Sequence, residues 1–223
     1  MSGVAALRWG AEDLWLQVEP HAPGFSIEVL PEAASTNTTL VELARAGDTA
    51  PCLLVAERQT AGRGRLGRSW QSSQAAPGDS LTFSLGCTLA PPDWSGLSLA
   101  VGLALAEALD PAGQHIGIKW PNDLWRRGRE GNSDRKLGGI LIETVPLPAE
   151  AAAHQPNARQ VVIGIGLNLA PVQLAPERAA LVAAVPPAWL QELEPALTAP
   201  QALHRIALPL WQGLQAFERE GFA

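Results

Sequence analysis

Residues 53–68 read Leu53-Leu54-Val55-Ala56-Glu57-Arg58-Gln59-Thr60-Ala61-Gly62-Arg63-Gly64-Arg65-Leu66-Gly67-Arg68. The stretch begins with an apolar run of strand length and leads into residues 61–68, which we call the Gly/Arg loop. Glycine lets backbone N–H groups approach a ligand closely, and guanidinium groups bind carboxylates and phosphates. The stretch therefore predicts a strand followed either by an anion-binding cradle or by a solvated surface loop.

The composition favours the anionic ligand. The chain has 223 residues, of which only 16 are Lys or Arg, and a formal net charge of −6, so a local cluster of arginines is unusual. An apolar fraction of 47% indicates a globular protein with a sizeable core. The acidic balance argues against a nucleic-acid partner. Cys52 and Cys87 read as small buried side chains in a reducing compartment.

No segment of the sequence has the character of a membrane span or a signal peptide. Residues 1–20 lack the basic start and long apolar core of a secretory signal, and acidic side chains interrupt them. No uninterrupted apolar run reaches the length needed to cross a bilayer. We therefore expect a cytoplasmic protein with no membrane partner.

The order of strand and helix patterns predicts the fold class. Strands are expected at residues 25–30, 53–57, 80–89, 116–120, 139–144 and 161–169. Helices are expected at residues 38–46, at 97–109 and from 175 onward. Residues 1–24 are expected to be a loosely structured or short-stranded lead-in, and residues 145–157 a surface insertion between two strands. This interleaving predicts an α+β domain, residues 25–223, in which helices flank a mixed β-sheet.

Polar residues at the ends of apolar segments are the candidate site residues. Ser35-Thr36-Asn37 precedes a predicted helix, where such side chains cap the free N–H groups and are also able to bind an amide-like ligand. Gln59 ends the strand before the Gly/Arg loop. Sites commonly lie where a rigid scaffold passes into a loop.

A second group is Lys119-Trp120-Pro121-Asn122-Asp123, at the end of another predicted strand. It is either a plain strand-ending turn or part of a site. Trp120 is expected to pack, and Pro121 to fix the direction of the two residues after it. Lys119 and Asp123 would form an ion pair, or bind an anion and a metal respectively.

A third group is Lys136-Leu137-Gly138-Gly139-Ile140. Adjacent glycines weaken a strand, so Gly138 and Gly139 indicate that a ligand or another backbone passes close by. Lys136 is either an exposed loop lysine or a cation of the site. A Walker motif is absent, and no Ser/His/Asp arrangement is apparent. Several cations with a glycine-lined backbone and one acid suit the chemistry of nucleotide phosphates.

The segment Gly164-Ile165-Gly166-Leu167-Asn168 lacks the third glycine and the following helix of a dinucleotide motif. Together with Ser35-Thr36-Asn37, the Gly/Arg loop with Ser69-Trp70, and the two lysine motifs, it closely resembles the catalytic domain of biotin–protein ligases, from about residue 25 to residue 222. The resemblance implies a class II synthetase-like biotin/lipoate ligase fold. It also implies biotin–[acetyl-CoA-carboxylase] ligase activity, in which biotin and Mg-ATP give biotinyl-5′-AMP. The biotinyl group then passes to a lysine of a biotin carboxyl carrier protein.

The resemblance also implies roles for the site residues. Ser35, Thr36 and Gln59 would bind the biotin head, and Arg63 would lie near the biotin carboxylate and the α-phosphate. Arg65 would close the loop over the adenylate, Lys136 would be the main catalytic cation, and Asp123 would position the acceptor lysine or a metal. Trp70 would pack beside adenine, and Asn168 would line the nucleotide side. The other substrate-binding positions implied are Asn37, Gly62, Gly64, Lys119, Asn122, Gly138 and Gly139. No protein metal site is expected.

The sequence departs from the family pattern in three respects. Leu66 stands where many relatives carry another arginine, which implies a less strongly charged loop. The roughly 24 residues before the first matching strand are too few for the DNA-binding domain of some relatives, so no DNA binding is expected. Relatives usually continue past the region of residues 221–222 into a small C-terminal β-barrel, which the resemblance implies is absent from this chain, either because the chain is cut or because the protein lacks that domain. A homodimer is plausible on the same resemblance. A lipoate or octanoate ligase and a non-catalytic biotin sensor are the alternatives.

Overall fold

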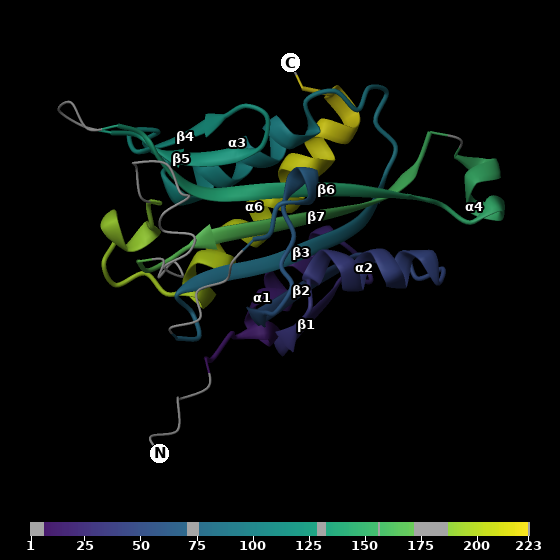
Figure 1. Cartoon of the computed structure of the whole chain (residues 1–223). Helices are drawn as coiled ribbons and strands as arrows, with labels where there is room; N and C mark the ends of the chain where they lie inside the picture. The colour runs from purple at the N-terminus through teal and green to yellow at the C-terminus, as the bar shows by residue number, and fades with distance from the viewer. Residues whose placement is uncertain (1–6, 71–75, 129–132, 156, 172–186, 223) are drawn as a thin grey trace.

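Strands that are buried along most of their length build the centre of this structure, a computed structural model that describes residues 7–70, 76–128, 133–155, 157–171 and 187–222 (Figure 1). The strands are β1 (Ser26–Ala33), β2 (Cys52–Gln59), β3 (Ser80–Leu89), β4 (Ile116–Lys119), β5 (Asp123–Arg126), β6 (Arg135–Pro146) and β7 (Arg159–Asn168). The α-helices are α1 (Ala11–Val18), α2 (Thr36–Arg45), α3 (Leu97–Leu109), α4 (Ala149–His154) and α6 (Ala199–Glu220). Short 3₁₀ turns are η1 (Glu19–His21), η2 (Arg65–Gly67) and η3 (Leu190–Glu192).

The strands form one mixed sheet in the order β1-β2-β3-β7-β6-β5-β4. β1 and β2 are parallel, and every other neighbouring pair is antiparallel. Because β3 pairs with both β2 and β7, segments far apart in the sequence lie side by side at the centre of the sheet. This confirms the predicted α+β fold with a mixed sheet and flanking helices.

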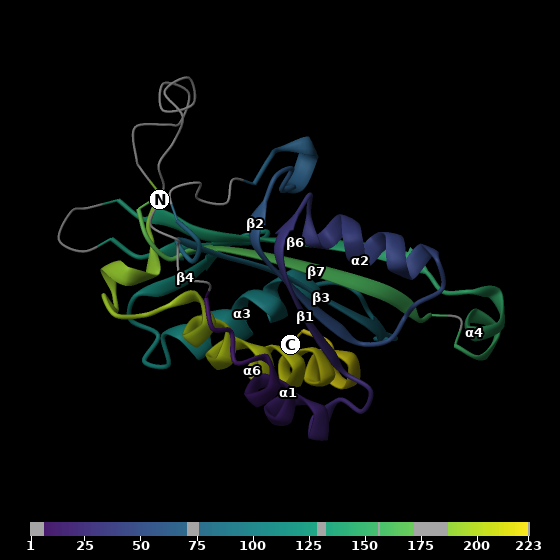
Figure 2. The ribbon, with the colours of Figure 1, turned by 90° about the horizontal axis from the view of Figure 1, so that it is seen from below.

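Helices cover both faces of the sheet. Helix α2 lies against one face, whereas α1, α3 and α6 lie against the other, as Figure 2 shows. The strand period of two separates the two faces. In β2, for example, Leu53 and Val55 join the large core under α3 and α6, and Leu54 joins the smaller core under α2. The α2 face therefore keeps fewer large apolar side chains, which leaves room for a site.

A β-bulge interrupts the alternation at the start of β6. Leu124 is opposite Gly138 and Trp125 is opposite Lys136, so β6 has one extra residue, Leu137, between them. Leu137 is fully buried in the large core. A bulge turns neighbouring side chains relative to the regular pleat, and this one lets both Lys136 and Gly139 line the cavity described below.

Most predicted elements are confirmed. Strand β3 and helix α3 have the predicted bounds, and the other predicted strands begin or end within a few residues of their expected positions. The insertion between β6 and β7 is present and contains α4. Two predictions were incomplete. β5 was missed because its first residue, Asp123, was assigned to a strand-ending turn, and the segment after residue 187 begins with η3 before it becomes helical. The predicted helix at residues 175–186 lies outside the described residues.

The prediction for the N-terminal segment was wrong. Residues 11–18 form α1, which packs against α6 and buries Leu14 and Val18. Trp9 donates its indole N–H to Glu57 at 2.9 Å, and its carbonyl oxygen lies 2.9 Å from His204 Nε2.

Trp120, which was expected to pack, is 78% exposed. No helix in the described ranges combines the length and the apolar character that a bilayer crossing requires.

Candidate functional site

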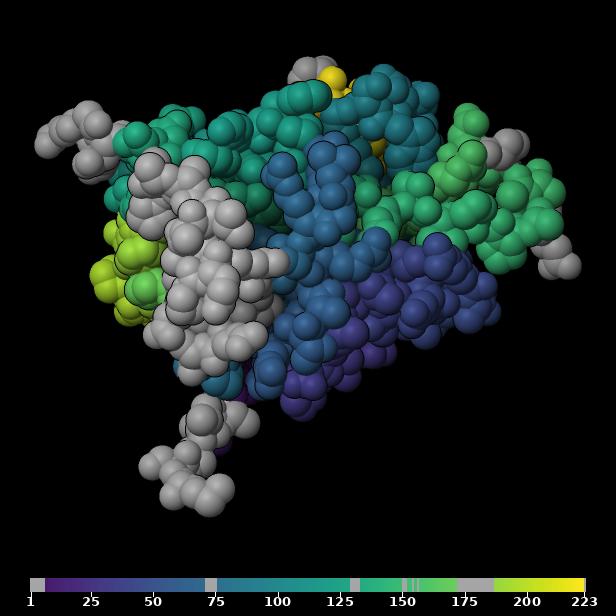
Figure 3. Space-filling view, viewed as in Figure 1, coloured from purple at the N-terminus to yellow at the C-terminus, as the bar shows by residue number. Residues whose placement is uncertain are grey.

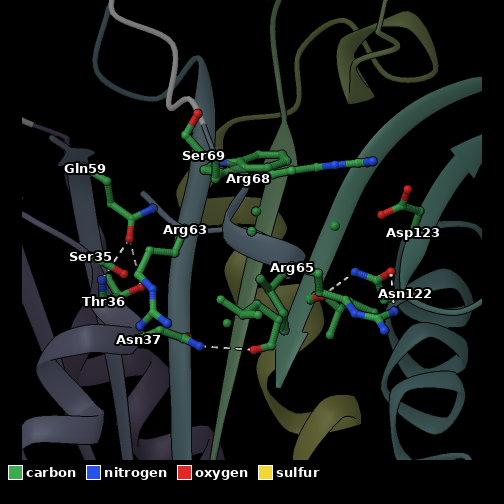
Figure 4. Close-up of a pocket in the computed structure, with 18 of the residues that line it drawn as sticks. Ser35, Thr36, Asn37, Gln59, Arg63, Arg65, Arg68, Ser69, Asn122 and Asp123 are labelled. Carbon is green, nitrogen blue, oxygen red and sulfur yellow. Dashed lines mark hydrogen bonds between the residues drawn. The ribbon is translucent and has the colours of Figure 1, made fainter. Parts of the chain in front are cut away.

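A cavity of about 370 Å³ opens on the α2 face of the sheet (Figure 4). It lies between the start of α2 and the end of β2 on one side, and β5 and the start of β6 on the other, with β7 as its floor. The Gly/Arg loop crosses its mouth. The structure brings together most of the predicted site residues here, namely Ser35, Thr36, Asn37, Gln59, Arg63, Gly64, Arg65, Trp70, Asn122, Asp123, Lys136 and Gly139.

The helix-start motif forms the uncharged end of the cavity. Ser35 caps α2 by accepting the Thr38 N–H at 3.4 Å, as predicted. Gln59 Oε1 accepts the backbone N–H of Thr36 at 2.8 Å and its hydroxyl at 3.3 Å. The oxygen of the Gln59 amide is therefore occupied, and its Nε2 has no hydrogen-bond partner among the described residues. This end presents hydroxyl and amide groups without a net charge.

Asn37 has a role that the sequence pattern did not indicate. Its side chain is buried and donates from Nδ2 to the Leu141 carbonyl at 3.1 Å and to Glu143 Oε2 at 3.0 Å. The Ser84 hydroxyl lies 2.6 Å from Asn37 Oδ1. A Cβ atom on Gly164 would be 2.2 Å from that oxygen. Asn37 therefore ties α2 to the sheet, and Gly164 makes the space for it.

Gly166, the second glycine of Gly164-Ile165-Gly166, makes space for the ring of Trp70. Gly166 is two residues after Gly164 on β7, so both face the cavity side of the sheet. A Cβ atom on Gly166 would be 2.4 Å from Cε2 of the Trp70 ring. The two glycines of Gly164-Ile165-Gly166 therefore admit protein side chains, which gives a physical reason for a motif that resembles a phosphate-binding loop only superficially.

The Gly/Arg loop is folded back on itself over the cavity. Gly64 N–H donates to the Arg68 carbonyl at 2.7 Å, and Trp70 N–H donates to the Gly62 carbonyl at 2.9 Å. Arg65 reaches the opposite wall, where its Nη1 donates to Asn122 Oδ1 at 3.1 Å (Figure 4). Leu66 is 89% exposed and has a φ of 56°, a conformation that glycine or asparagine adopts more readily. Leu66 thus points an apolar side chain into solvent.

Figure 3 shows how this loop lies on the surface. The segment coloured blue, which includes the Gly/Arg loop, runs across the middle of the face between the teal and purple parts of the chain. The loop bridges the two sides of the cavity, because Arg63 faces the α2 side and Arg65 faces Asn122. A ligand of the cavity would therefore lie beneath this loop.

Arg63 lies against a carboxylate that sequence reasoning missed. Its Nη2 is 2.9 Å from Glu143 Oε1 and its Nη1 is 3.2 Å from Glu143 Oε2, an end-on bidentate pair. Nη1 is also 3.4 Å from Thr38 Oγ1. Glu143 lies 80 residues from Arg63 in the sequence, within an otherwise apolar strand, so no local pattern identified it. The sequence signal that could have identified Glu143 was its charge within a strand predicted to be apolar.

Lys136 and Asp123 meet across β5 and β6. Lys136 Nζ donates to Asp123 Oδ1 at 2.7 Å, with the lysine side chain 43% exposed and the carboxylate 25% exposed. Lys119 does not pair with Asp123, because its Nζ lies 3.8 Å from the centroid of the Trp125 ring, and it is not among the residues that line the cavity. Asn122 donates to the Ile140 carbonyl at 2.7 Å, which fixes the amide that receives Arg65.

The remaining predicted residues support the site from outside its lining. Gly62 is buried, and a Cβ there would be 2.6 Å from the Trp70 carbonyl oxygen. Gly138 has the same relation to β7, since its Cβ would be 2.6 Å from the Gly166 carbonyl oxygen. Asn168 is buried and donates to the Ala188 carbonyl at 2.9 Å. The adjacent glycines were predicted to make room for a ligand or for another backbone. Gly138 makes room for the backbone of β7, whereas Gly139 lines the cavity.

Charge is unevenly distributed along the cavity. Arg63 and Lys136 each have a carboxylate partner, whereas no ion pair within the described residues involves Arg65 or Arg68. No group of three or more His, Cys, Asp or Glu side chains in the described part of the chain is placed to hold a metal ion. The arrangement suits a ligand with a neutral hydrogen-bonding head and a negatively charged tail.

The mixed sheet and this cavity define an α+β domain with a pocket suited to a small anionic ligand. Residues 29–168 match the family model described as "Biotin/lipoate A/B protein ligase family". The chain belongs to this family.

Two curated relatives show the extent of the similarity. The chain is 35% identical over 215 residues to "Bifunctional ligase/repressor BirA" of Escherichia coli (strain K12), covering 93% of this chain and 59% of the relative. It is 36% identical over 166 residues to "Biotin--[acetyl-CoA-carboxylase] ligase" of Mycobacterium tuberculosis, covering 70% of this chain and 54% of the relative. The chain therefore spans little more than half the length of these relatives.

Solved structures show the same fold. "Biotin protein ligase from Aquifex aeolicus in complex with biotin and ATP" aligns with a TM-score of 0.62 at 26% identity, covering 87% of this chain and 72% of that chain. A lipoate protein ligase from Thermoplasma acidophilum aligns with a TM-score of 0.53 at 12% identity, covering 85% of this chain and 84% of that chain. The second similarity concerns the fold alone.

Proposed function

We propose that this chain is the catalytic domain of an ATP-dependent biotin–protein ligase. The observation that supports this most directly is the division of one cavity into an uncharged end at Ser35, Thr36 and Gln59 and a cationic end at Arg65, Arg68 and Lys136. Biotin has a neutral ureido head and a carboxylate tail, and ATP brings further negative charge to that tail. The curated relatives named as biotin ligases and the solved complex with biotin and ATP agree with this assignment.

The first step would join biotin to AMP. An oxygen of the biotin carboxylate attacks the α-phosphorus of ATP, a new C(O)–O–P linkage forms, and the bond to the departing pyrophosphate breaks. Two anions approach each other in this reaction, so nearby cations stabilise the transition state. Lys136 is the best placed of these, because Asp123 holds its Nζ at 2.7 Å on the cavity wall. Arg65 adds charge from above.

The second step would transfer the biotinyl group to an acceptor lysine. The neutral ε-amine attacks the acyl carbon, an amide bond forms, AMP leaves, and the amine loses one proton. The Asp123 carboxylate accepts a hydrogen bond from Lys136 and lines the cavity, so it is placed to orient an incoming amine. The acceptor we propose is the lysine of a biotin carboxyl carrier protein.

Magnesium would enter with the nucleotide. Mg²⁺ in nucleotide sites commonly binds substrate phosphates and one or two carboxylates, with water in the remaining positions. Among the described residues that line the cavity, Asp123 is the carboxylate available for such a role. This donor set fits an ion held mainly by ATP phosphates, where it would neutralise charge, and does not provide a complete protein cage.

Two assays with the same protein test the proposal. ATP–pyrophosphate exchange should depend on biotin, and biotin transfer to a carrier domain should require both ATP and the acceptor lysine. Exchange with lipoate or octanoate but not with biotin would overturn the substrate assignment in favour of the lipoate branch. Biotin binding without pyrophosphate or AMP release would instead identify a non-catalytic sensor.

A further inference from the structure

Arg63 uses most of its hydrogen-bonding capacity within the protein. A guanidinium group has five N–H donors. Its end-on edge, formed by Nη1 and Nη2, contacts the two oxygens of Glu143 at 3.2 and 2.9 Å, and Nη1 also lies 3.4 Å from Thr38 Oγ1. Bidentate contacts of this kind fix both partners in orientation. The guanidinium is therefore already engaged before any ligand arrives.

Glu143 is itself held from the interior. Its Oε2 accepts a hydrogen bond at 3.0 Å from Asn37 Nδ2, and Asn37 is buried. The Ser84 hydroxyl, also buried, lies 2.6 Å from Asn37 Oδ1. A continuous chain of hydrogen bonds therefore links Ser84 on β3, Asn37 on α2 and Glu143 on β6, and it ends at Arg63. Glu143 has a fixed position because a buried network supports it.

The same contact closes the base of the Gly/Arg loop. Arg63 pairs with Ser69 in an antiparallel bridge, and Trp70 N–H donates to Gly62 at 2.9 Å, so the two legs of the loop are joined next to Arg63. Arg65 lies nearer the tip and contacts Asn122 on the opposite wall. Fixing Arg63 to β6 therefore fixes the base of the loop, whereas within the described residues Arg65 is the side chain that ties its tip to the opposite wall.

The charges at this position also argue against direct anion binding by Arg63. A ligand carboxylate or phosphate on Arg63 would lie close to the Glu143 carboxylate, and repulsion between the two anions would offset the attraction. Arg65 and Arg68 have no such neighbour among the described residues. Lys136 also lies beside a carboxylate, but within the described residues it donates one hydrogen bond to Asp123, so two of its three N–H donors are left for a ligand.

We propose that Glu143 is a positioning residue, which fixes Arg63 and with it the base of the Gly/Arg loop. Contact with the negatively charged part of the ligand then belongs to Arg65, Arg68 and Lys136. This inference rests on the proposed function only for the identity of the ligand. The Arg63–Glu143 pair itself is a property of the substrate-free protein.

Hydrogen exchange of the loop amides, residues 61–70, tests the pair without any substrate. Glu143→Gln keeps the shape of the side chain and removes its charge, and Arg63→Met removes the guanidinium. Either variant should speed exchange of the loop by about 5- to 10-fold, and the double variant should be no faster than the singles. Glu194→Gln is a matched control, because Glu194 forms a similar exposed bidentate pair with Arg205 at 2.6 and 2.8 Å on the far side of the molecule. Exchange in Glu143→Gln equal to that of this control would overturn the proposal.

Steady-state kinetics of adenylate formation separate positioning from direct contact. Arg63→Met leaves an unpaired carboxylate beside an anion-binding cavity, so KM for ATP should rise roughly 10-fold with a smaller change in kcat. Adding Glu143→Gln to that variant removes the unpaired charge but leaves the base of the loop free, so KM of the double variant should return to that of Glu143→Gln alone. A double variant clearly more impaired than Glu143→Gln alone would show that Arg63 contacts the ligand directly, against the proposal. If the unmodified protein forms no adenylate while loop exchange responds as expected, the proposed function fails and the positioning role of Glu143 stands.

Discussion

Gly166→Ala should destabilise the protein through a single contact, the one with Trp70. A Cβ atom at residue 166 would lie 2.4 Å from Cε2 and 2.6 Å from Cζ2 of that ring. The backbone of β7 has no freedom to recede, because Gly166 is paired with Thr82 on one side and Gly139 on the other. The ring must therefore retreat by about 1 Å to reach ordinary van der Waals contact.

Overpacking of this kind costs about 1–3 kcal/mol. Urea unfolding followed by circular dichroism measures that cost directly. In a Trp70→Ala background the ring is gone, and the cost of Gly166→Ala should fall to near zero, which gives a coupling energy of about 1–3 kcal/mol between the two positions. Because Trp70 lines the cavity, Gly166→Ala should also raise KM for the nucleotide while leaving biotin affinity less affected.

Gly86→Ala is the matched control for Gly166→Ala. Gly86 is also a buried glycine in the sheet, on β3, but its Cβ would meet Leu40 at 3.4 Å, an ordinary contact. Its replacement should change the free energy of unfolding by no more than about 0.5 kcal/mol. The reasoning would be refuted if Gly166→Ala cost the same with and without Trp70, or no more than Gly86→Ala.

Three further variants probe charge. Lys136→Ala should slow adenylate formation by about 10²–10³ in a rate assay, because it removes the cation nearest the reacting anions. Arg65→Gly removes the contact of the loop with Asn122 and should release adenylate, seen as labelling of bystander lysines on a streptavidin blot. Burial raises the pKa of Asp110, but hydrogen bonds from the backbone N–H groups of residues 114–116 together lower it by more. The pKa of Asp110 is therefore below its usual value. Asp110 therefore stabilises the fold above about pH 4, and Asp110→Ala should lose that part of the acid dependence.

Each of these three predictions has an outcome that would contradict it. A normal adenylation rate in folded Lys136→Ala would remove Lys136 from its role. Unchanged acceptor selectivity in Arg65→Gly would show that the loop does not retain the intermediate. For Asp110, the free energy of unfolding is measured from pH 2.5 to 6. A folded pKa below the unfolded one means that its contribution is lost as pH falls, so an Asp110→Ala curve as steep as that of the unmodified protein would contradict the argument.

The sequence predicted those parts of the site that depend on local patterns. Ser35 was predicted as a helix cap because capping needs only a few consecutive residues, and it is one. Lys136 was recognised by its adjacent glycines, which mark a close approach of other atoms. The strands were recognised by their apolar character, since each faces a core on at least one side.

The features that were missed depend on contacts between distant segments. Glu143 reaches Arg63 only because the sheet order places β6 beside the loop that follows β2. The bulge at Leu137 cannot be read from β6 alone, because it is defined by the register with β5. Helix α1 begins at Gly10 without a side-chain cap, so the usual signal for a helix start is absent. Trp120 was expected to pack, but it lies in the turn between the edge strand β4 and β5 and is exposed.

The insertion between β6 and β7 has a practical use for engineering. Its short helix α4 projects from the end of the sheet, at the opposite end of the molecule from η3 (Figures 1 and 2). The residues that line the cavity come from other segments of the chain. Surface connections tolerate added residues at a modest entropic cost. An affinity tag or a fluorescent reporter inserted there would leave the ligand pocket and the Gly/Arg loop intact, so the protein could be immobilised or labelled without blocking either chain end.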